Sequence, residues 1–354
     1  MSEMQAERDQ DFQQSEHVTT QLAPPIRDLN GAYGVVERLR SRLRASVRGR
    51  DDVIELIIIA MLSDGHVLLE DFPGSGKTTL AKALGDSIVD DNPNDDIVTF
   101  RRIQFTPDLL PSDVTGTTVF DPHTNRFHYR PGPIFSHIVL ADEINRTSPK
   151  VQSAMLEAMA EKQVTVDNRT RKLDEFFFVI ATQNPLDLAG TFPLPSAQLD
   201  RFLFKIKMTH ISRESELELL ATFKQRKLGG AQNLPRVTRT EIIDSRHCIE
   251  NFVHVSPFIN ECLVDIAQAT RNDPRILQGA STRSLVLWIP ALQARAVTQI
   301  RDYVNADDVR MLAALIFGHR LELAPGADGI ERVLSDCLAA PLEKLARATL
   351  HRGT

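Results

Sequence analysis

Apolar runs along the chain follow two different patterns, and the change lies near residue 208. Before it, short continuous apolar runs alternate with helical patterns, at residues 66–70, 97–105, 137–141, 176–182 and 202–208. Runs of this length predict buried strands of a parallel sheet that helices cover on both faces. After it, apolar residues recur only at helical spacing, for example at residues 214–223, 257–270 and 282–300. We therefore expect an α/β fold with a five-stranded parallel sheet, followed by an all-helical unit.

The first 32 residues show neither pattern. They are rich in Gln, Asp and Glu and include the segment Leu22-Ala23-Pro24-Pro25. Such a sequence offers little apolar surface to offset the entropy lost on ordering, so residues 1–32 are predicted to be a disordered polar tail. An arm that binds a partner is the alternative. The expected division is a tail at 1–32, an α/β core at 33–210 and a helical domain at 211–354.

Length and composition fit this division. A chain of 354 residues exceeds what one core usually absorbs, and 42% hydrophobic with 25% charged residues is ordinary for a soluble globular protein. The 41 Lys and Arg against 47 Asp and Glu give a formal charge of −6. This balance gives no support to binding a phosphate backbone, so no nucleic-acid partner is expected.

Neither the cysteines nor the apolar runs point to secretion or to a membrane. Cys248, Cys262 and Cys337 lack metal-ligand spacing, and so sparse a set fits a reducing cytoplasm. The longest apolar run, residues 56–62, is far shorter than the roughly 20 residues that span a bilayer. The N-terminus lacks the basic-then-apolar pattern of a signal peptide. A cytoplasmic protein without a membrane span is expected.

A glycine-rich segment after the first predicted strand carries the strongest chemical signal. It reads Pro73-Gly74-Ser75-Gly76-Lys77-Thr78-Thr79, and a helical pattern follows at residues 78–85. Glycines let backbone N–H groups turn towards phosphate oxygens, and a helix N-terminus favours negative charge. Lys77 is expected to reach the β- and γ-phosphates of ATP, and the Thr78 hydroxyl to bind Mg²⁺. Asp71 stands where the pattern usually begins with glycine, and a surface Gly-Lys turn is the alternative.

Two adjacent carboxylates end the third predicted strand. Asp142 and Glu143 directly follow the apolar residues 138–141. A buried strand end is a costly place for paired acids unless a cation or a polarised water lies there. Asp142 is expected to hold the water shell of Mg²⁺, and Glu143 to orient the attacking water as a base. A solvated strand end that caps the next helix is the alternative. The glycine-rich segment disfavours it, because its Lys77 precedes Asp142 by 65 residues on an alternating α/β chain.

Two more polar residues stand at strand ends. Asn184 follows the fourth predicted strand, where it could hydrogen-bond the same water and sense the γ-phosphate, although an Asn-Pro turn is the plain alternative. Arg201 precedes the last predicted strand. Arginine stabilises the charge on a transferring phosphoryl group, often from a neighbouring subunit, and a surface ion pair with Asp200 is the alternative. The residues alone leave both roles open.

The order of these motifs resembles the AAA+ ATPases, and three longer stretches resemble their MoxR family. Residues 104–116 read QFTPDLLPSDVTG, residues 141–147 read ADEINRT, and residues 181–202 contain ATQNP, GTFPLP and LDRF. The resemblance runs from about residue 36 to beyond residue 283. Thr282 stands where members often have proline, and Ser196 where an acid is common, whereas Asp71 also occurs in the family.

The resemblance implies a role for each matched residue. Lys77 and Thr78 match Walker A, and Asp142 and Glu143 match Walker B. Among single residues, the implied roles are sensor 1 for Asn184, the arginine finger for Arg201, sensor 2 of the lid for Arg283, and the adenine pocket for Val47 and Gly49. Hydrolysis is then expected to reposition the lid through Arg283.

Two inserts carry turn signals. Residues 117–130 contain Asp121-Pro122 and Thr124-Asn125, and residues 163–174 contain Asp167-Asn168, so both predict β-hairpins. In ring ATPases such hairpins face the pore or the client protein. Plain surface hairpins are the alternative.

The resemblance implies an ATP hydrolase that uses Mg²⁺ and forms a homo-oligomeric, hexameric ring with ATP between subunits. It also implies chaperone-like maturation of a partner, often one with a von Willebrand factor A domain. A nucleic-acid motor of related ring type is one alternative, for which the basic residues Arg169, Arg171 and Lys172 would be used. A nucleotide-gated scaffold is another, but it would need neither Glu143 nor Arg201.

Overall fold

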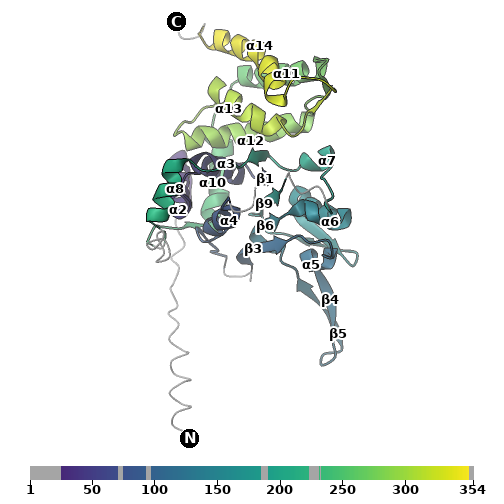
Figure 1. The fold of residues 1–354 in the computed structure, drawn as a ribbon. Helices are drawn as coiled ribbons and strands as arrows, with labels where there is room; N and C mark the ends of the chain where they lie inside the picture. Colours follow the sequence, from purple (N-terminus) through teal and green to yellow (C-terminus); the bar gives the residue numbers. More distant parts are fainter. Residues whose placement is uncertain are drawn as a thin grey trace.

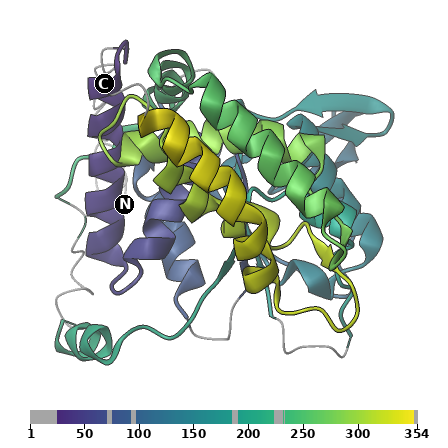
Figure 2. The same ribbon diagram turned by 90° about the horizontal axis from the view of Figure 1, so that it is seen from above.

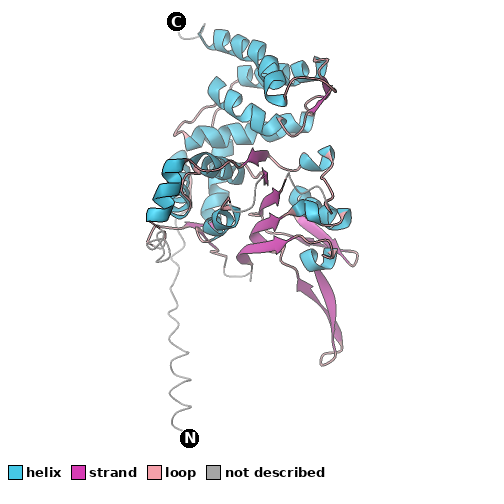
Figure 3. Cartoon of the chain, in the orientation of Figure 1, coloured by secondary structure: helices cyan, strands magenta, loops and turns pink. Residues whose placement is uncertain are grey.

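The computed structural model describes residues 25–350 except 71–74, 93–96, 185–189, 223–230 and 232. Five parallel strands form its central sheet in the order β10-β1-β9-β6-β3 (Figure 3). Their bounds are β1 Val67–Glu70, β3 Val98–Gln104, β6 Ser136–Asp142, β9 Phe178–Gln183 and β10 Phe204–Lys207. Each strand lies within or overlaps one of the five predicted runs, so the parallel α/β sheet is confirmed.

The sheet separates two hydrophobic cores, because side chains alternate along each strand. In β6, which is buried throughout, Ile138 and Leu140 face one core while Val139 and Ala141 face the other. A strand buried on both faces is apolar at most positions, which explains the apolar run at residues 138–141. Helices cover the two faces, with α2 Leu29–Ser46, α3 Asp51–Leu62 and α4 Lys77–Gly85 on one, and α5 Pro111–Thr115 and α6 Pro149–Glu161 on the other.

Helix α2 begins inside the range predicted for the tail. Asp28 is its N-cap, and the carboxylate accepts a hydrogen bond of 2.9 Å from the N–H of Gly31. This cap satisfies a backbone donor at the helix start, so the ordered core begins at Leu29 and not at residue 33. The boundary at residue 32 was therefore placed too late, and residues 1–24 lie outside the described chain.

The second half of the chain is helical, as expected. Its helices are α8 Arg213–Ala221, α10 Arg239–Phe252, α11 Pro257–Asn272, α12 Thr282–Thr298, α13 Ala306–Phe317 and α14 Ile330–Leu350. Figure 2 shows α11 and α14 side by side, and α12 and α13 lie between them and the sheet domain in Figure 1. Helix α10 packs instead against α2 and α3. Within the described ranges, no helix is both long and apolar enough to cross a lipid bilayer.

Two pairs of very short strands accompany the helices. Strand β2 (Ile88–Val89) pairs with β11 (Val237–Thr238), and β12 (Ile276–Gln278) pairs with β13 (Glu322–Leu323). The second pair lies within the unit that was expected to be helical throughout. Strands of two or three residues are too short to produce a recognisable period, so periodicity did not reveal them.

Both predicted hairpins are present and touch each other. The first consists of β4 (Gly116–Asp121) and β5 (Arg126–Pro131), which project from the body in Figure 1. The second consists of β7 (Gln163–Val166) and β8 (Arg169–Lys172). Thr118 donates to Asp167 across 2.6 Å, and the Arg171 guanidinium lies 3.6 Å above the Tyr129 ring. Nearer the tip of the first hairpin, Phe120 and Phe127 are exposed, and their ring centroids are 5.1 Å apart.

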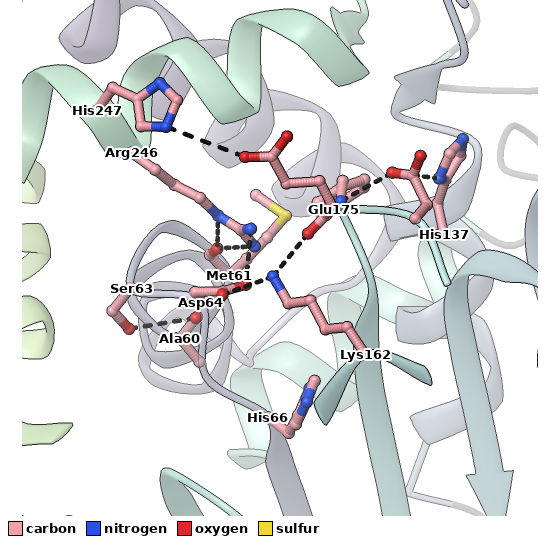
Figure 4. A network of polar contacts seen from close by, with 12 residues as sticks. Ala60, Met61, Ser63, Asp64, His66, His137, Lys162, Glu175, Arg246 and His247 are labelled. Atoms are coloured by element: carbon pink, nitrogen blue, oxygen red, sulfur yellow. Dashed lines mark hydrogen bonds and ion pairs between the residues drawn. The ribbon is translucent and has the colours of Figure 1, made fainter. Parts of the chain in front are cut away.

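A charged network attaches α10 to the amino ends of the sheet strands (Figure 4). Arg246 points from α10 towards Asp64, at 2.7 Å, and donates to the Met61 carbonyl at 2.9 and 2.7 Å. Lys162 joins the same Asp64 carboxylate, at 2.6 Å, to the carbonyl of Glu175, at 2.7 Å. Asp64 and Glu175 precede β1 and β9, so the network lies at the sheet edge opposite the strands' carboxyl ends.

A buried histidine extends this attachment. His137 of β6 lies 3.0 Å from a carboxylate oxygen of Asp90 and 3.4 Å from one of Asp174, which also pairs with Arg239 of α10 at 2.8 Å. Burial acts to lower the pKa of His137, but the two carboxylates outweigh burial and raise it. Burial acts to raise the pKa of Asp174, yet its bonds to His137 and Arg239 hold it well below the usual range.

Candidate functional site

The polar residues singled out in the sequence gather at the carboxyl ends of neighbouring strands. Strand β6 ends at Asp142, and Asn184 directly follows β9. Strand β1 lies beside β9 and leads towards the start of α4. In open parallel sheets, ligands bind at this edge, outside the carboxyl ends of the strands. The structure therefore brings the predicted phosphate, metal and water residues to one edge.

Helix α4 begins where the sequence placed the phosphate loop. Gly76 is its N-cap with a φ of 93°, a conformation that favours glycine, and Lys77 is the first helical residue. Because glycine has no side chain that could cap the helix, the first backbone N–H groups of α4 receive no hydrogen bond from their N-cap residue and can donate to another acceptor. Ser75, Thr78 and Thr79 flank this start, whereas the predicted Asp71, Pro73 and Gly74 lie outside the described residues.

Asp142 is held on both carboxylate oxygens. It is 4% exposed, and its Oδ1 accepts a hydrogen bond of 2.7 Å from the Thr182 hydroxyl of β9. Its Oδ2 accepts two from Arg102 of β3, at 3.1 Å from Nε and 2.6 Å from Nη2. A buried carboxylate needs such partners, because an unpaired buried charge is costly. Arg102 and Thr182 thus contact the site. Arg102 lies in none of the sequence motifs, and Thr182 lies in the ATQNP stretch, where no role was expected for it.

Glu143 points into the same region from a left-handed backbone conformation with φ of 59°. Its N–H donates to the Thr182 hydroxyl at 2.8 Å, so one threonine fixes both acids. Its carboxylate accepts a hydrogen bond of 3.0 Å from Gln104 and lies 3.3 Å from Arg146. Non-glycine residues in this backbone region store strain and occur often at functional sites. Gln104 begins the family-like stretch at 104–116, which was the available signal for it.

A second polar group lies where β1, β9 and β10 end. Glu70 accepts a hydrogen bond of 2.7 Å from Gln183 and pairs with Lys205 at 2.6 Å. Asn184, next after Gln183, is buried. Glu70 is the last residue of β1 before the phosphate loop, so these contacts fix the point from which that loop departs.

A cavity of about 300 Å³ lies beside the start of α4. Its wall includes Ser75, Gly76 and Thr79 at the phosphate loop, the predicted adenine-pocket residue Val47, and the nearby Arg48 and Arg50. Gly49 does not line the cavity, but it has a φ of 67° and a Cβ there would lie 2.6 Å from the Ser215 hydroxyl. Gly49 therefore allows the chain between α2 and α3 to pass close to α8.

The far wall of this cavity was not foreseen. It consists of residues from the connection after β10 and from α8, namely His210, Ile211, Glu216 and Leu219. Residues 214–223 were predicted as a helix, but nothing in that period indicates which face meets a ligand. Glu218 of α8 pairs with Arg48 of the connection between α2 and α3 at 3.6 Å, so α8 lies against that connection at the cavity.

The two predicted arginines lie together, away from the cavity. Among the residues that the structure describes, none forms a hydrogen bond or ion pair with the Arg201 guanidinium. Arg283, in the first turn of α12, has its Nε 4.0 Å from a carboxylate oxygen of the adjacent Asp200. Helix α7 (Ser196–Leu199), which leads to Arg201, and helix α8 at the cavity stand on opposite sides of the sheet in Figure 1. One copy thus does not bring its two arginines to its own cavity.

The residues present fit Mg²⁺ and a nucleotide. Mg²⁺ prefers oxygen ligands and is usually held by one or two carboxylates together with substrate phosphates. Asp142 and Thr78 supply such oxygens, and the Arg102 contact shows that the Asp142 carboxylate already attracts positive charge. In the described part of the chain, no group of three His, Cys, Asp or Glu side chains is placed to hold a metal by itself. A cation bound largely through nucleotide phosphates agrees with that donor set.

The parallel sheet in this strand order, the phosphate loop before α4 and the helical lid define an ATPase of the AAA+ class. The family model described as "ATPase family associated with various cellular activities (AAA)" matches residues 66–204, and the "AAA lid domain" model matches residues 268–336. The chain belongs to the MoxR family of these ATPases. It is 36% identical to Chaperone MoxR1 of Mycobacterium tuberculosis, over 85% of this chain and 80% of that protein.

Two further relatives cover most of the chain. Protein YeaC of Bacillus subtilis is 45% identical, over 84% of this chain and 92% of that protein. A crystal structure of an ATPase candidate from Cytophaga hutchinsonii superimposes with a TM-score of 0.78 at 34% identity, covering 88% of this chain and 95% of that one. The expected AAA+ core with a helical lid is therefore confirmed.

Proposed function

We propose that this protein hydrolyses ATP at sites shared between adjacent copies in a hexameric ring, and that the free energy of hydrolysis drives the remodelling or maturation of a partner protein. The observation that carries the proposal is the position of Arg201. Its guanidinium has no partner among the described residues, and α7, which leads to it, stands across the sheet from α8 at the cavity. An arginine placed in this way can serve the site of a neighbouring copy.

In this proposal each residue keeps the role that its position supports. Ser75 to Thr79, together with Pro73 and Gly74, hold the phosphates, Val47 and Gly49 shape the adenine pocket, and Thr78 and Asp142 hold Mg²⁺. When bound, Mg²⁺ neutralises charge on the phosphate oxygens. Glu143 orients the attacking water and accepts its proton, and Asn184 hydrogen-bonds near that water.

Arg201 and Arg283 are proposed to act together on the neighbour's nucleotide. Both lie close to Asp200, one as the next residue and one at 4.0 Å, which supports a shared position of the finger and the lid arginine at the proposed interface. Positive charge at that point stabilises the phosphoryl group as negative charge spreads over its oxygens. The division into a nucleotide-binding core at about 29–210 and a lid at 211–354 remains part of the proposal.

The partner is proposed to be a protein, reached by the two hairpins. The exposed Phe120 and Phe127 rings offer an apolar contact on a projecting element, which a folded or extended polypeptide can use. The name of Chaperone MoxR1 agrees with such a task. A client with a von Willebrand factor A domain and a cytoplasmic location stay within the proposal.

The test is Mg²⁺-dependent ATP hydrolysis against protein concentration for wild type, Glu143→Gln, Arg201→Ala and their equal mixture. We expect activity to rise with concentration and to fall strongly in each variant. In random mixed rings about a quarter of the interfaces pair an intact Glu143 with an intact Arg201, so about a quarter of the activity should return. Wild-type rates in Arg201→Ala would contradict the shared site, and ATP binding without turnover in wild type would favour a scaffold.

A further inference from the structure

One buried arginine of the lid uses all its hydrogen-bond donors. Arg320 lies between α13 and β13 and is 5% exposed. Its Nε donates to the Asp200 carboxylate at 2.6 Å, its Nη2 to the carbonyls of Asp200 and Phe202 at 3.2 and 2.7 Å, and its Nη1 to the carbonyls of Leu203, at 3.2 Å, and Ile316. A guanidinium has five N–H donors, so none is left over.

Four of these five acceptors belong to the segment that carries Arg201. Residues 200–203 connect α7, a helix of only four residues, to the edge strand β10. Arg320 restricts the motion of this segment, because it binds backbone carbonyls on both sides of Arg201. It forms no hydrogen bond with the Arg201 side chain itself.

The neighbouring lid residues strengthen the same contact. His319 is buried, and its Nε2 lies 3.0 Å from the Phe202 carbonyl. Burial, followed by the nearby Arg320 charge, lowers the pKa of His319 to about 3, so its imidazole is neutral near pH 7 and can donate from Nε2. Arg283 approaches the second oxygen of Asp200. Three lid side chains thus converge on residues 200–202.

We propose that Arg320 is a positioning residue that fastens the Arg201 segment to the lid, so that the lid and the arginine finger move as one unit. This inference rests on the proposed function, in which Arg201 completes the site of the adjacent copy. A lid that shifts with the nucleotide state of its own subunit would then move the Arg201 of that subunit relative to the nucleotide site of the adjacent copy. Arg320 itself touches no nucleotide residue among those described, and it acts through Arg201.

The test compares Arg320→Lys with wild type in kcat, KM and the dissociation constant of a fluorescent ATP analogue. Lysine keeps the charge but offers three donors from one point, so it cannot bind the five acceptors together. We expect kcat to fall about tenfold or more while the analogue's dissociation constant changes less than twofold. Arg332→Lys, an exposed substitution on α14, is the matched control and should behave as wild type.

Mixed rings separate positioning from damage to the subunit. Glu143→Gln subunits carry intact fingers, and Arg320→Lys subunits carry intact nucleotide sites, so an equal mixture should regain activity, as is expected of the Arg201→Ala mixture. If Arg201→Ala loses activity and is rescued but Arg320→Lys keeps wild-type kcat, or is not rescued, the inference is wrong and the shared site stands. If Arg201→Ala itself keeps wild-type activity, the proposed function fails first.

A second variant covers the case in which Arg320→Lys does not fold. Asp200→Asn keeps the backbone carbonyls that Arg320 binds and removes only the charge between Arg320 and Arg283. We expect a folded protein, checked by its thermal transition, with lowered kcat, unchanged analogue affinity and rescue by Glu143→Gln. Wild-type kcat in folded Asp200→Asn would overturn the inference.

Discussion

The guanidinium of Arg102 lies 2.6 Å from Oδ2 of Asp142, the carboxylate that we propose for Mg²⁺. The Arg102 side chain is 47% exposed, so it can turn outward without leaving a buried position. Two positive charges a few ångströms apart repel each other strongly at the reduced dielectric of a strand end. Arg102 and Mg²⁺ are therefore expected to compete for the same oxygen.

Replacing Arg102 with methionine should lower the Mg²⁺ concentration that gives half-maximal ATP hydrolysis. A hydrogen bond to a charged group contributes about 1.5–3 kcal/mol in general, and partial exposure reduces this, so a shift of about fivefold is expected. The measurement is the hydrolysis rate at fixed ATP over a range of free Mg²⁺.

Arg101→Met is the matched control for this prediction. Arg101 is the preceding residue of β3, is exposed, and by strand alternation faces away from Asp142. It should leave the Mg²⁺ requirement unchanged. An unchanged or higher requirement in Arg102→Met would show that Arg102 does not compete with the cation.

Gly49→Ala should weaken ATP binding through displacement of α8. The new Cβ would lie 2.6 Å from the Ser215 hydroxyl and 3.2 Å from the Cβ of Ile211, in the wall opposite the phosphate loop. We expect a loss of affinity of about tenfold for a fluorescent ATP analogue, together with lower stability, because alanine at a φ of 67° costs about 1 kcal/mol.

Gly326→Ala separates the two effects. Gly326 has a φ of 83°, but a Cβ there meets no atom within 4 Å. This variant should lose similar stability from backbone strain and keep wild-type affinity for the analogue. Equal affinities in the two variants would mean that α8 does not shape the nucleotide cavity.

Features that depend on residues close together in the chain could be predicted from the sequence. The inner strands β6 and β9 are mostly apolar because both of their faces are buried. The second hairpin turns at Asp167 and Asn168, which adopt φ values of 49° and 58°. The phosphate loop and the Asp-Glu pair were found for the same reason, since each is contiguous in the chain. Helix α2 was cut short because its first turn shares the polar character of the preceding residues.

What the sequence did not predict depends on residues far apart in the chain. Arg102 reaches Asp142 because β3 and β6 are paired, and Arg320 reaches Asp200 across 120 positions. Arginines of this kind look like ordinary surface charges until the fold places them. The cavity wall from α8 is a similar case, because a helical period does not tell which face meets the loop after α2.

Acid should destabilise the protein partly through His66. His66 is buried, its Nδ1 accepts from the N–H of Val179 at 3.2 Å, and its Nε2 therefore donates to the Met159 carbonyl at 3.0 Å. Burial lowers the pKa of His66 to about 4, whereas the unfolded chain takes up the proton near pH 6.5. The neutral histidine thus contributes stability above pH 6.5 that is lost as the pH falls towards 4.

The His66→Gln variant isolates this effect, because glutamine keeps a donor and an acceptor but does not titrate. Between pH 7 and pH 4.5, wild type should lose about 2–3 kcal/mol more unfolding free energy than the variant. Urea unfolding at the two pH values measures it. His319, whose pKa is also lowered, is present in both proteins and cancels. Equal losses would show that His66 takes up its proton at the same pH in the folded protein as in the unfolded chain.

Arg283→Ala should lower turnover without weakening nucleotide binding in the same subunit. Arg283 lies beside Asp200 and is absent from the wall of the cavity next to Gly76, so in the proposed ring its charge is directed at the neighbouring subunit. We expect kcat to fall about tenfold or more and the analogue's dissociation constant to stay within twofold. Arg310→Ala, an exposed substitution on α13, should change neither value.

Mixing then decides which subunit Arg283 serves. If it acts on the neighbour, Glu143→Gln subunits supply an intact Arg283 to the nucleotide sites of Arg283→Ala subunits, and the mixture regains activity. If it acts within its own subunit, every site with an intact Glu143 still lacks Arg283, and the mixture stays as low as the variants alone. The second result, joined to weakened binding, would place Arg283 over its own nucleotide and require a lid position different from the one in which it contacts Asp200.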